Sequence, residues 1–257
     1  MRLQSKKKVI LRGKVLGGPA PLTCLPLVAA DQPTLLEQAG QVLPFQPDTL
    51  EWRVDKFDAV RDAEAVSKAL GALRETIGNI PLIFTCRIID EGGFQEISPE
   101  DRLRVNEAVI ASGLVDLVDT ELSNSETMVG EIRQACQKTG TKLILSYHNF
   151  EKTPEADFIT DRLRAAQKLG GDVAKAAVMP KNYQDVLTLL SATYTARTEL
   201  LEIPIITMAM GTEGAITRIA GGLFGSDLTF AIGKASSAPG QIPIADLRKA
   251  WSALSFS

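Results

Sequence analysis

The stretch "GGDVAKAAVMP", residues 170–180, has the composition of a buried strand, with one exception. Val, Ala and Met surround Lys175, and Pro180 ends the run. Strands of parallel sheets are apolar throughout because both of their faces are covered. Burying an unpaired ammonium is costly. Lys175 therefore either extends past the end of its strand or is held inside the protein for use.

Short apolar runs of this kind recur along the chain, 24 to 33 residues apart, which is the length of one strand–helix unit. They cover residues 21–29, 49–57, 81–88, 114–122, 142–150, 172–179, 203–210 and 227–233. Eight strands alternating with helices predict a (β/α)8 TIM barrel of the α/β class. An open doubly wound sheet is the alternative, but no GxGxxG motif follows the first run to favour it.

Amphipathic segments lie between the runs, and two of them carry helix-start signals. Ser98 followed by Pro99 predicts a cap and a first helical residue. Thr153 and Pro154 predict a second start in the same way, with Gly170 at the end of that helix. Ahead of the first run, "KVILRGKVLGG" (8–18) predicts a β-hairpin that plugs the N-terminal end of the barrel. We expect one barrel domain over residues 1–257, with a tail and hairpin over about residues 1–20.

The composition excludes several classes of function. A net charge of −3 gives no electrostatic basis for nucleic-acid binding. His148 is the only histidine, so zinc sites built on two or three histidines of one chain are excluded. The cysteines, Cys24, Cys86 and Cys136, lack metal-ligand spacing, and we read them as core residues in a reducing, cytoplasmic setting. No apolar signal region or membrane span is predicted.

Polar residues occur where the predicted strands end, which is where barrel enzymes carry their chemistry. Each has an ordinary explanation: Glu51 and Arg53 as an ion pair, His148 as a core residue, Lys175 as a side chain reaching out to solvent. Ionisable groups of both signs on successive strands are nevertheless costly unless they face one another or a ligand. The residues in question are Glu51, Arg53, Arg87, Asp90, Glu91, Asp119, Glu121, His148, Lys175, Met208, Met210, Arg218, Ser236, Ser237 and Gln241.

These residue types indicate imine chemistry. A buried lysine near Arg87 is expected to be partly neutral, and a neutral amine attacks a ketone or aldehyde to give a Schiff base. The iminium makes the adjacent carbon acidic, and His148 is the only imidazole available as the base. Glu91 is placed to orient it, and the arginines suggest a substrate carboxylate. The residues alone predict a metal-free Schiff-base lyase or aldolase acting on a small anionic carbonyl compound.

Seven blocks of the chain resemble the type I 3-dehydroquinase (3-dehydroquinate dehydratase) family, in that family's order. They are "EWRVDKF" (51–57), "FTCRIIDEGG" (84–93), "DLVDTEL" (116–122), "SYHNF" (146–150), "KAAVMP" (175–180), "MAMGTEGAITRIAGGLFGS" (208–226) and "SSAPGQI" (236–242). The resemblance implies a (β/α)8 barrel that dehydrates 3-dehydroquinate to 3-dehydroshikimate by syn elimination. It also implies no cofactor or metal, a cytoplasmic homodimer, and a place in the shikimate pathway towards chorismate and the aromatic amino acids.

The resemblance also implies residue roles. Lys175 forms the imine with the C3 ketone, His148 takes the C2 proton and returns one to the departing C1 hydroxyl, and Glu91 positions the histidine. The implied substrate-binding residues are Glu51, Arg53, Arg87, Arg218, Ser237 and Gln241, with Asp119, Met208 and Met210 as supporting residues around them. Arg218 is the best match for the grip on the substrate carboxylate.

Two rival functions remain at this stage. A class I aldolase or transaldolase would normally need a phosphate-binding run of glycine amides after the last strands. The sequence "SSAPGQ" (236–241) stands there instead. A non-catalytic relative would be signalled by the loss of Lys175 or His148, and both are present.

Overall fold

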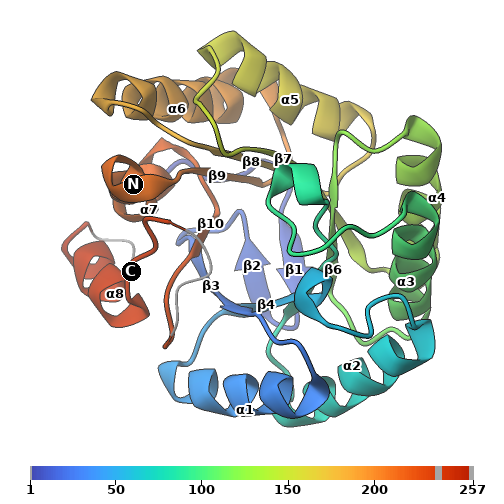
Figure 1. The fold of residues 1–257 in the computed structure, drawn as a ribbon. Helices are drawn as coiled ribbons and strands as arrows, with labels where there is room; N and C mark the ends of the chain where they lie inside the picture. Colours follow the sequence, from blue (N-terminus) through green and yellow to red (C-terminus); the bar gives the residue numbers. More distant parts are fainter. Residues whose placement is uncertain (1, 235–238, 255–257) are drawn as a thin grey trace.

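The computed structural model describes residues 2–234 and 239–254, and within them eight parallel strands form a nearly closed barrel (Figure 1). In the order in which they pair, the strands are β10 (Leu228–Phe230), β3 (Leu22–Leu27), β4 (Thr49–Arg53), β5 (Leu82–Thr85), β6 (Leu117–Glu121), β7 (Lys142–Asn149), β8 (Val173–Val178) and β9 (Ile205–Ala209). Hydrogen bonds bridge the seam between β9 and β10. The Asp227 amide donates to the Ile205 carbonyl at 2.7 Å, and the Thr207 amide donates to Ser226 Oγ at 3.0 Å. The predicted barrel is confirmed.

A ring of helices surrounds the sheet, as Figure 1 shows. The α-helices are α1 (Gln32–Val42), α2 (Ala63–Ile77), α3 (Pro99–Ala111), α4 (Glu126–Thr139), α5 (Ala156–Lys168), α6 (Tyr183–Thr195), α7 (Gly211–Phe224) and α8 (Ile244–Ala253). Short 3₁₀ and π turns are η1 (Leu43–Phe45), η2 (Val54–Lys56), η3 (Ile89–Glu91) and η4 (Ala196–Leu200). Within the described residues, no helix is long and apolar enough to cross a membrane.

One of the two predicted helix starts is confirmed and the other is wrong. Ser98 caps α3, because its hydroxyl accepts a hydrogen bond from the Asp101 amide. Helix α5 begins at Ala156 with Glu155 as its cap, not at Thr153. Thr153 does not act as a cap, because its buried Oγ1 has no hydrogen-bond partner among the described residues. Upstream of it, the Asn149 side chain accepts from the amides of residues 151 and 152 in a turn.

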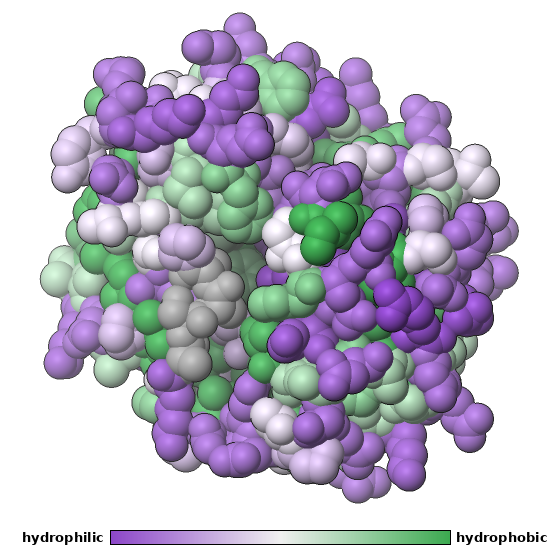
Figure 2. Space-filling view, viewed as in Figure 1, coloured by the Kyte–Doolittle hydropathy of each residue, from purple (hydrophilic) through white to green (hydrophobic). Residues whose placement is uncertain are grey.

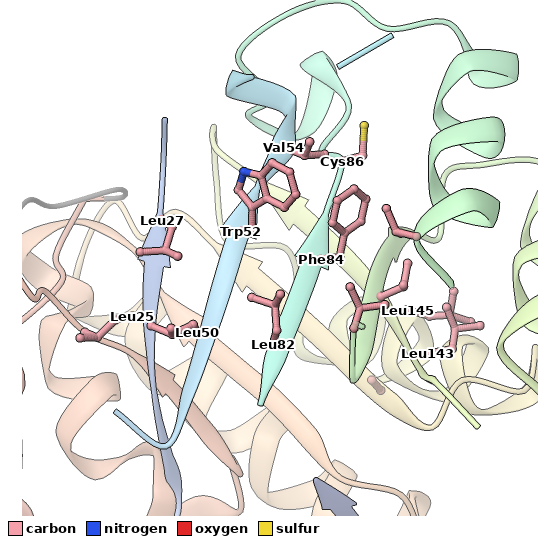
Figure 3. Close-up of a cluster of buried hydrophobic side chains, with 14 of the residues drawn as sticks. Leu25, Leu27, Leu50, Trp52, Val54, Leu82, Phe84, Cys86, Leu143 and Leu145 are labelled. Atoms are coloured by element: carbon pink, nitrogen blue, oxygen red, sulfur yellow. The ribbon is translucent and has the colours of Figure 1, made fainter. Parts of the chain in front are cut away.

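Side chains that point outward from the strands pack against the helices and form the main core (Figure 3). Trp52 on β4 lies at its centre, with ring centroids 5.7 Å from Phe57 and 5.6 Å from Phe84 in edge-on geometry. Leu25 and Leu50 extend this layer along neighbouring strands, as the close-up shows. This core fixes the strands whose inward side chains build the site.

The inward side chains form a second, smaller cluster with the N-terminal hairpin, which consists of β1 (Val9–Leu11) and β2 (Lys14–Leu16). Leu16 is fully buried and belongs to the same cluster as Cys24, Ile144 and Val173. The hairpin therefore closes the N-terminal end of the barrel, as predicted. The three cysteines are all buried and unpaired, as their apolar surroundings predicted.

Candidate active site

A pocket opens at the end of the barrel opposite the hairpin, where Figure 2 shows a hollow in the molecular surface. Its cavity volume is about 180 Å³, which leaves room for a small molecule. Ten residues singled out from the sequence line it: Glu51, Arg53, Arg87, Glu91, His148, Lys175, Met208, Met210, Arg218 and Gln241. Ser236 and Ser237 lie outside the described residues.

Strand register explains why the lysine and the histidine share this pocket. Lys175 on β8 pairs with Ser146 on β7, and the next inward position of β7 is His148. His148 pairs with Ala177, which in turn pairs with Met208 on β9. The lysine therefore lies one layer deeper in the barrel than the histidine, and both face the same space.

Lys175 is 4% exposed and is held by carboxylates. Its Nζ donates to Asp119 Oδ2 at 2.7 Å and lies 4.0 Å from Glu51 Oε1. It also lies 4.8 Å from the centre of the Phe230 ring. The like charge of Arg87, expected near this amine, is therefore opposed by acidic groups, because the partners described for Lys175 Nζ are Asp119 and Glu51.

Asp119 is 1% exposed, so it belongs to the buried site and is not a solvated charge at the end of its strand. Burial by itself raises the pKa of this carboxyl, but Arg87 and Lys175 outweigh burial and hold it well below its usual range. Arg87 lies 3.0 Å from Asp119 and 2.7 Å from Glu121, and donates to Ser146 Oγ at 2.8 Å. Two carboxylates therefore balance the charge of Arg87 before any ligand binds.

His148 forms a pair with Glu91. Glu91 Oε2 lies 3.0 Å from the imidazole Nδ1 and accepts a 2.8 Å hydrogen bond from the His148 backbone amide. Burial, with Arg87 and Lys175 nearby, lowers the pKa of His148 well below its ordinary value, so the ring is neutral. Burial raises the pKa of Glu91 to about 7. The contact at Nδ1 leaves Nε2 as the ring nitrogen available to a ligand.

The three pocket arginines differ in their partners. Arg53 makes a two-point contact with Asp55, at 2.9 and 2.8 Å, and donates to the Gly92 carbonyl. Arg218 on α7 donates to the carbonyls of Phe230 and Pro239, both at 3.2 Å. In the part of the chain that the structure describes, Arg218 has no acidic partner, and burial lowers its pKa to about 10. It is the buried cation best prepared for an anionic ligand.

Sequence reasoning missed three residues that matter here. Asp55 is fully buried and fixes Arg53, and its position two residues after that arginine was a usable signal. Phe230 lies beside the lysine ammonium, and Ser123 donates to Glu91 Oε1 at 2.7 Å. Neither carries a signal in the sequence, because ordinary core phenylalanines and loop serines look the same. Among residues 2–234 and 239–254, no cluster of three potential metal ligands occurs.

Comparisons with known proteins agree with one another. The model of the family described as type I 3-dehydroquinase matches residues 23–256. The 3-dehydroquinate dehydratase of Geobacillus thermodenitrificans is 45% identical over 251 residues, covering 97% of each chain. The crystal structure of 3-dehydroquinate dehydratase from Geobacillus kaustophilus has a TM-score of 0.96 at 45% identity, covering 99% of this chain and 98% of that one. The type I enzyme of Clostridium difficile, solved with covalent modified comenic acid, has a TM-score of 0.94 at 38% identity, with coverages of 96% and 98%.

Proposed function

Because this chain belongs to the type I 3-dehydroquinase family, we propose that its pocket dehydrates 3-dehydroquinate through an imine on Lys175. The chain is a hydro-lyase of the shikimate pathway, and its product is 3-dehydroshikimate. The observation that carries the residue assignment is the buried Lys175, one layer below the His148–Glu91 pair in the same pocket.

The first step forms the imine. Lys175 loses a proton and attacks the C3 ketone, and the carbinolamine then loses water to give a protonated imine. Asp119 holds the amine in place without taking its proton, because the pKa of this carboxyl is depressed. Water that enters the open pocket accepts the amine proton, so this step does not depend on His148.

The second step is the elimination. The protonated imine withdraws electrons, so the C2 proton becomes acidic, and Nε2 of His148 removes it to leave an enamine. The enamine expels the C1 hydroxyl, which takes the proton from the imidazolium and departs as water. Hydrolysis of the conjugated imine then frees Lys175 and 3-dehydroshikimate. The ionised form of Glu91 keeps the Nδ1 proton of His148 in place and stabilises the imidazolium.

Substrate binding is divided among the other pocket residues. Arg218 grips the C1 carboxylate, because it is the buried pocket cation without an acidic partner in the described part of the chain. Glu51, Arg53 and Gln241 line the same pocket and are assigned to the substrate hydroxyls. The assignment of Ser237 to this group rests on the family resemblance alone. Arg87 lines the pocket too, but its ion pairs with Asp119 and Glu121 indicate that it holds these carboxylates in place.

The direct test is to add 3-dehydroquinate and follow the enone absorbance of 3-dehydroshikimate. The wild-type chain should produce it, and Lys175→Ala should not. A Lys175→Ala variant that turns over at the wild-type rate would refute the imine assignment.

We further propose that the protein is a cytoplasmic homodimer, as the family resemblance implies. The three buried, unpaired cysteines fit a reducing compartment. Light scattering on the purified chain tests the assembly, and a monomer at micromolar concentration would contradict it.

A further inference from the structure

Glu91 has a neighbour on the side away from the catalytic histidine. The two carboxylate oxygens of Glu91 have different partners. Oε2 contacts His148, and Oε1 accepts a 2.7 Å hydrogen bond from the hydroxyl of Ser123. Ser123 follows the end of β6, whereas Glu91 ends the η3 turn. The carboxylate is therefore fixed at both ends by groups from different parts of the barrel.

A second cavity lies behind this carboxylate. It is bounded by the η3 turn and by the starts of α3 and α4, and Glu91 and Ser123 both line it. Glu91 also lines the catalytic pocket, whereas Ser123 does not. Ser123 thus contacts Glu91 from outside the catalytic pocket, and Ser123 itself is exposed.

We propose that Ser123 is a positioning residue for the elimination step, acting through Glu91 to keep His148 competent as a base. This inference rests on the function proposed above, in which Nε2 of His148 removes the C2 proton. Donation from Ser123 fixes the rotamer that points Oε2 at Nδ1, and it favours the ionised carboxylate. An ionised Glu91 accepts the Nδ1 proton, which leaves the lone pair on Nε2.

The opposite protonation state disables the base. A protonated Glu91 donates to Nδ1, so the neutral imidazole carries its own proton on Nε2 and cannot accept one from C2. Burial raises the pKa of Glu91 to about 7, and the Ser123 hydroxyl pulls it down. The charged or titratable groups that act on Glu91 or line the second cavity with it are Arg87, Asp90, Glu96, Arg102, Glu121 and His148. The catalytic pocket adds Glu51, Arg53, Lys175 and Arg218. All of them remain when Ser123 is changed, so the substitution isolates the hydroxyl.

Three variants test the inference through the pH profile of kcat. Ser123→Ala should move the acid limb upward by about half to one pH unit, the size expected for losing one hydrogen bond to a carboxylate. At pH 7 that shift lowers kcat about two- to fivefold. KM and the rate of imine formation, measured by rapid borohydride quenching, should stay at wild-type values.

The other two variants supply rescue and control. Ser123→Thr keeps the hydroxyl and should keep the wild-type profile, since the exposed site has room for a methyl group. Ser125→Ala changes a serine that lines the same second cavity but hydrogen-bonds the Met128 amide, and it should leave the acid limb unmoved.

An unshifted acid limb in Ser123→Ala overturns the inference, whether or not the overall rate falls. A similar shift in Ser125→Ala does so as well, because a change in the cavity would then be the cause. Failure of the wild-type chain to dehydrate 3-dehydroquinate would instead refute the proposed function, before Ser123 comes into question.

Discussion

Replacing Arg218 with methionine separates substrate binding from stability, and the two effects can be worked out from the structure. Arg218 is 1% exposed, and the partners described for its guanidinium are two carbonyls and the sulfur of Met208. A substrate carboxylate gives this cation its first anionic partner. Arg218→Met removes that contact while nearly keeping the volume of the side chain.

The expected loss of binding is large. Hydrogen bonds to charged groups contribute about 1.5–3 kcal/mol. At about 1.4 kcal/mol per tenfold, KM should rise roughly 10- to 150-fold. The contact exists in both the ground state and the transition state, so kcat should fall much less than kcat/KM.

The expected loss of stability is small, and Arg87→Met provides the matched comparison. Removing Arg218 takes away a buried charge that has no acidic partner in the described residues, so the free energy of unfolding should change by about 1 kcal/mol or less. Removing Arg87 leaves Asp119 and Glu121 without the cation that balances them. Breaking buried pairs in this way costs about 3–5 kcal/mol.

Initial rates from the enone absorbance give kcat and KM, and urea denaturation gives the two unfolding free energies. A KM within twofold of wild type in Arg218→Met would show that another group holds the carboxylate, with Arg53 as the next candidate. Equal destabilisation by the two substitutions would refute the reasoning about charge balance.

Three further outcomes follow from the site. Borohydride added with substrate should inactivate the protein irreversibly and modify the peptide carrying Lys175; an adduct on another lysine would contradict the imine assignment, and chelators should leave activity intact. His148→Ala should still form the imine but eliminate about 10²–10⁴-fold more slowly, so mass spectrometry should show a covalent species that accumulates; turnover near the wild-type rate would move the base to another residue. Because burial raises the pKa of Glu91 from 4.5 to about 7, the folded state binds its proton more tightly than the unfolded state. The stability that this group contributes is fully present below pH 4.5 and is lost as the pH rises through 7. In Glu91→Gln, the free energy of unfolding in urea should therefore depend less on pH between 4.5 and 7. The same pH dependence as in the wild type would contradict this reasoning.

The sequence predicts the barrel well because strands covered on both faces must be apolar. The eight runs therefore stand out, and each of them contains one of the eight observed strands. Boundaries that depend on a side chain elsewhere are harder to predict. The capping pattern at Thr153 places the start of α5 too early, because the Thr153 hydroxyl makes no hydrogen bond in the described structure and the helix begins at Ala156.

In the candidate site, too, the sequence predicts some features and leaves others hidden. The positions of Lys175, His148 and Glu91 follow from strand ends, so ten of the residues picked from the sequence do meet in one pocket. Their partners depend on distances between strands, which no local pattern carries. Asp119 beside Lys175, and the lack of an acid beside Arg218 among the described residues, decide the electrostatics. Both become visible only once the barrel is folded.

The hairpin that closes the N-terminal end also has an electrical consequence. Leu16, Ile144 and Val173 put hydrocarbon, which polarises weakly, where an open barrel would admit water. Arg87 and Lys175 line the pocket above this layer, and Asp119 lies beside them. A bound substrate that displaces pocket water seals the other side, and Coulomb forces grow as the local dielectric constant falls. The short strands β1 and β2 at the N-terminal end of the barrel thereby strengthen the electric field that acts on the reacting carbons at the opposite end.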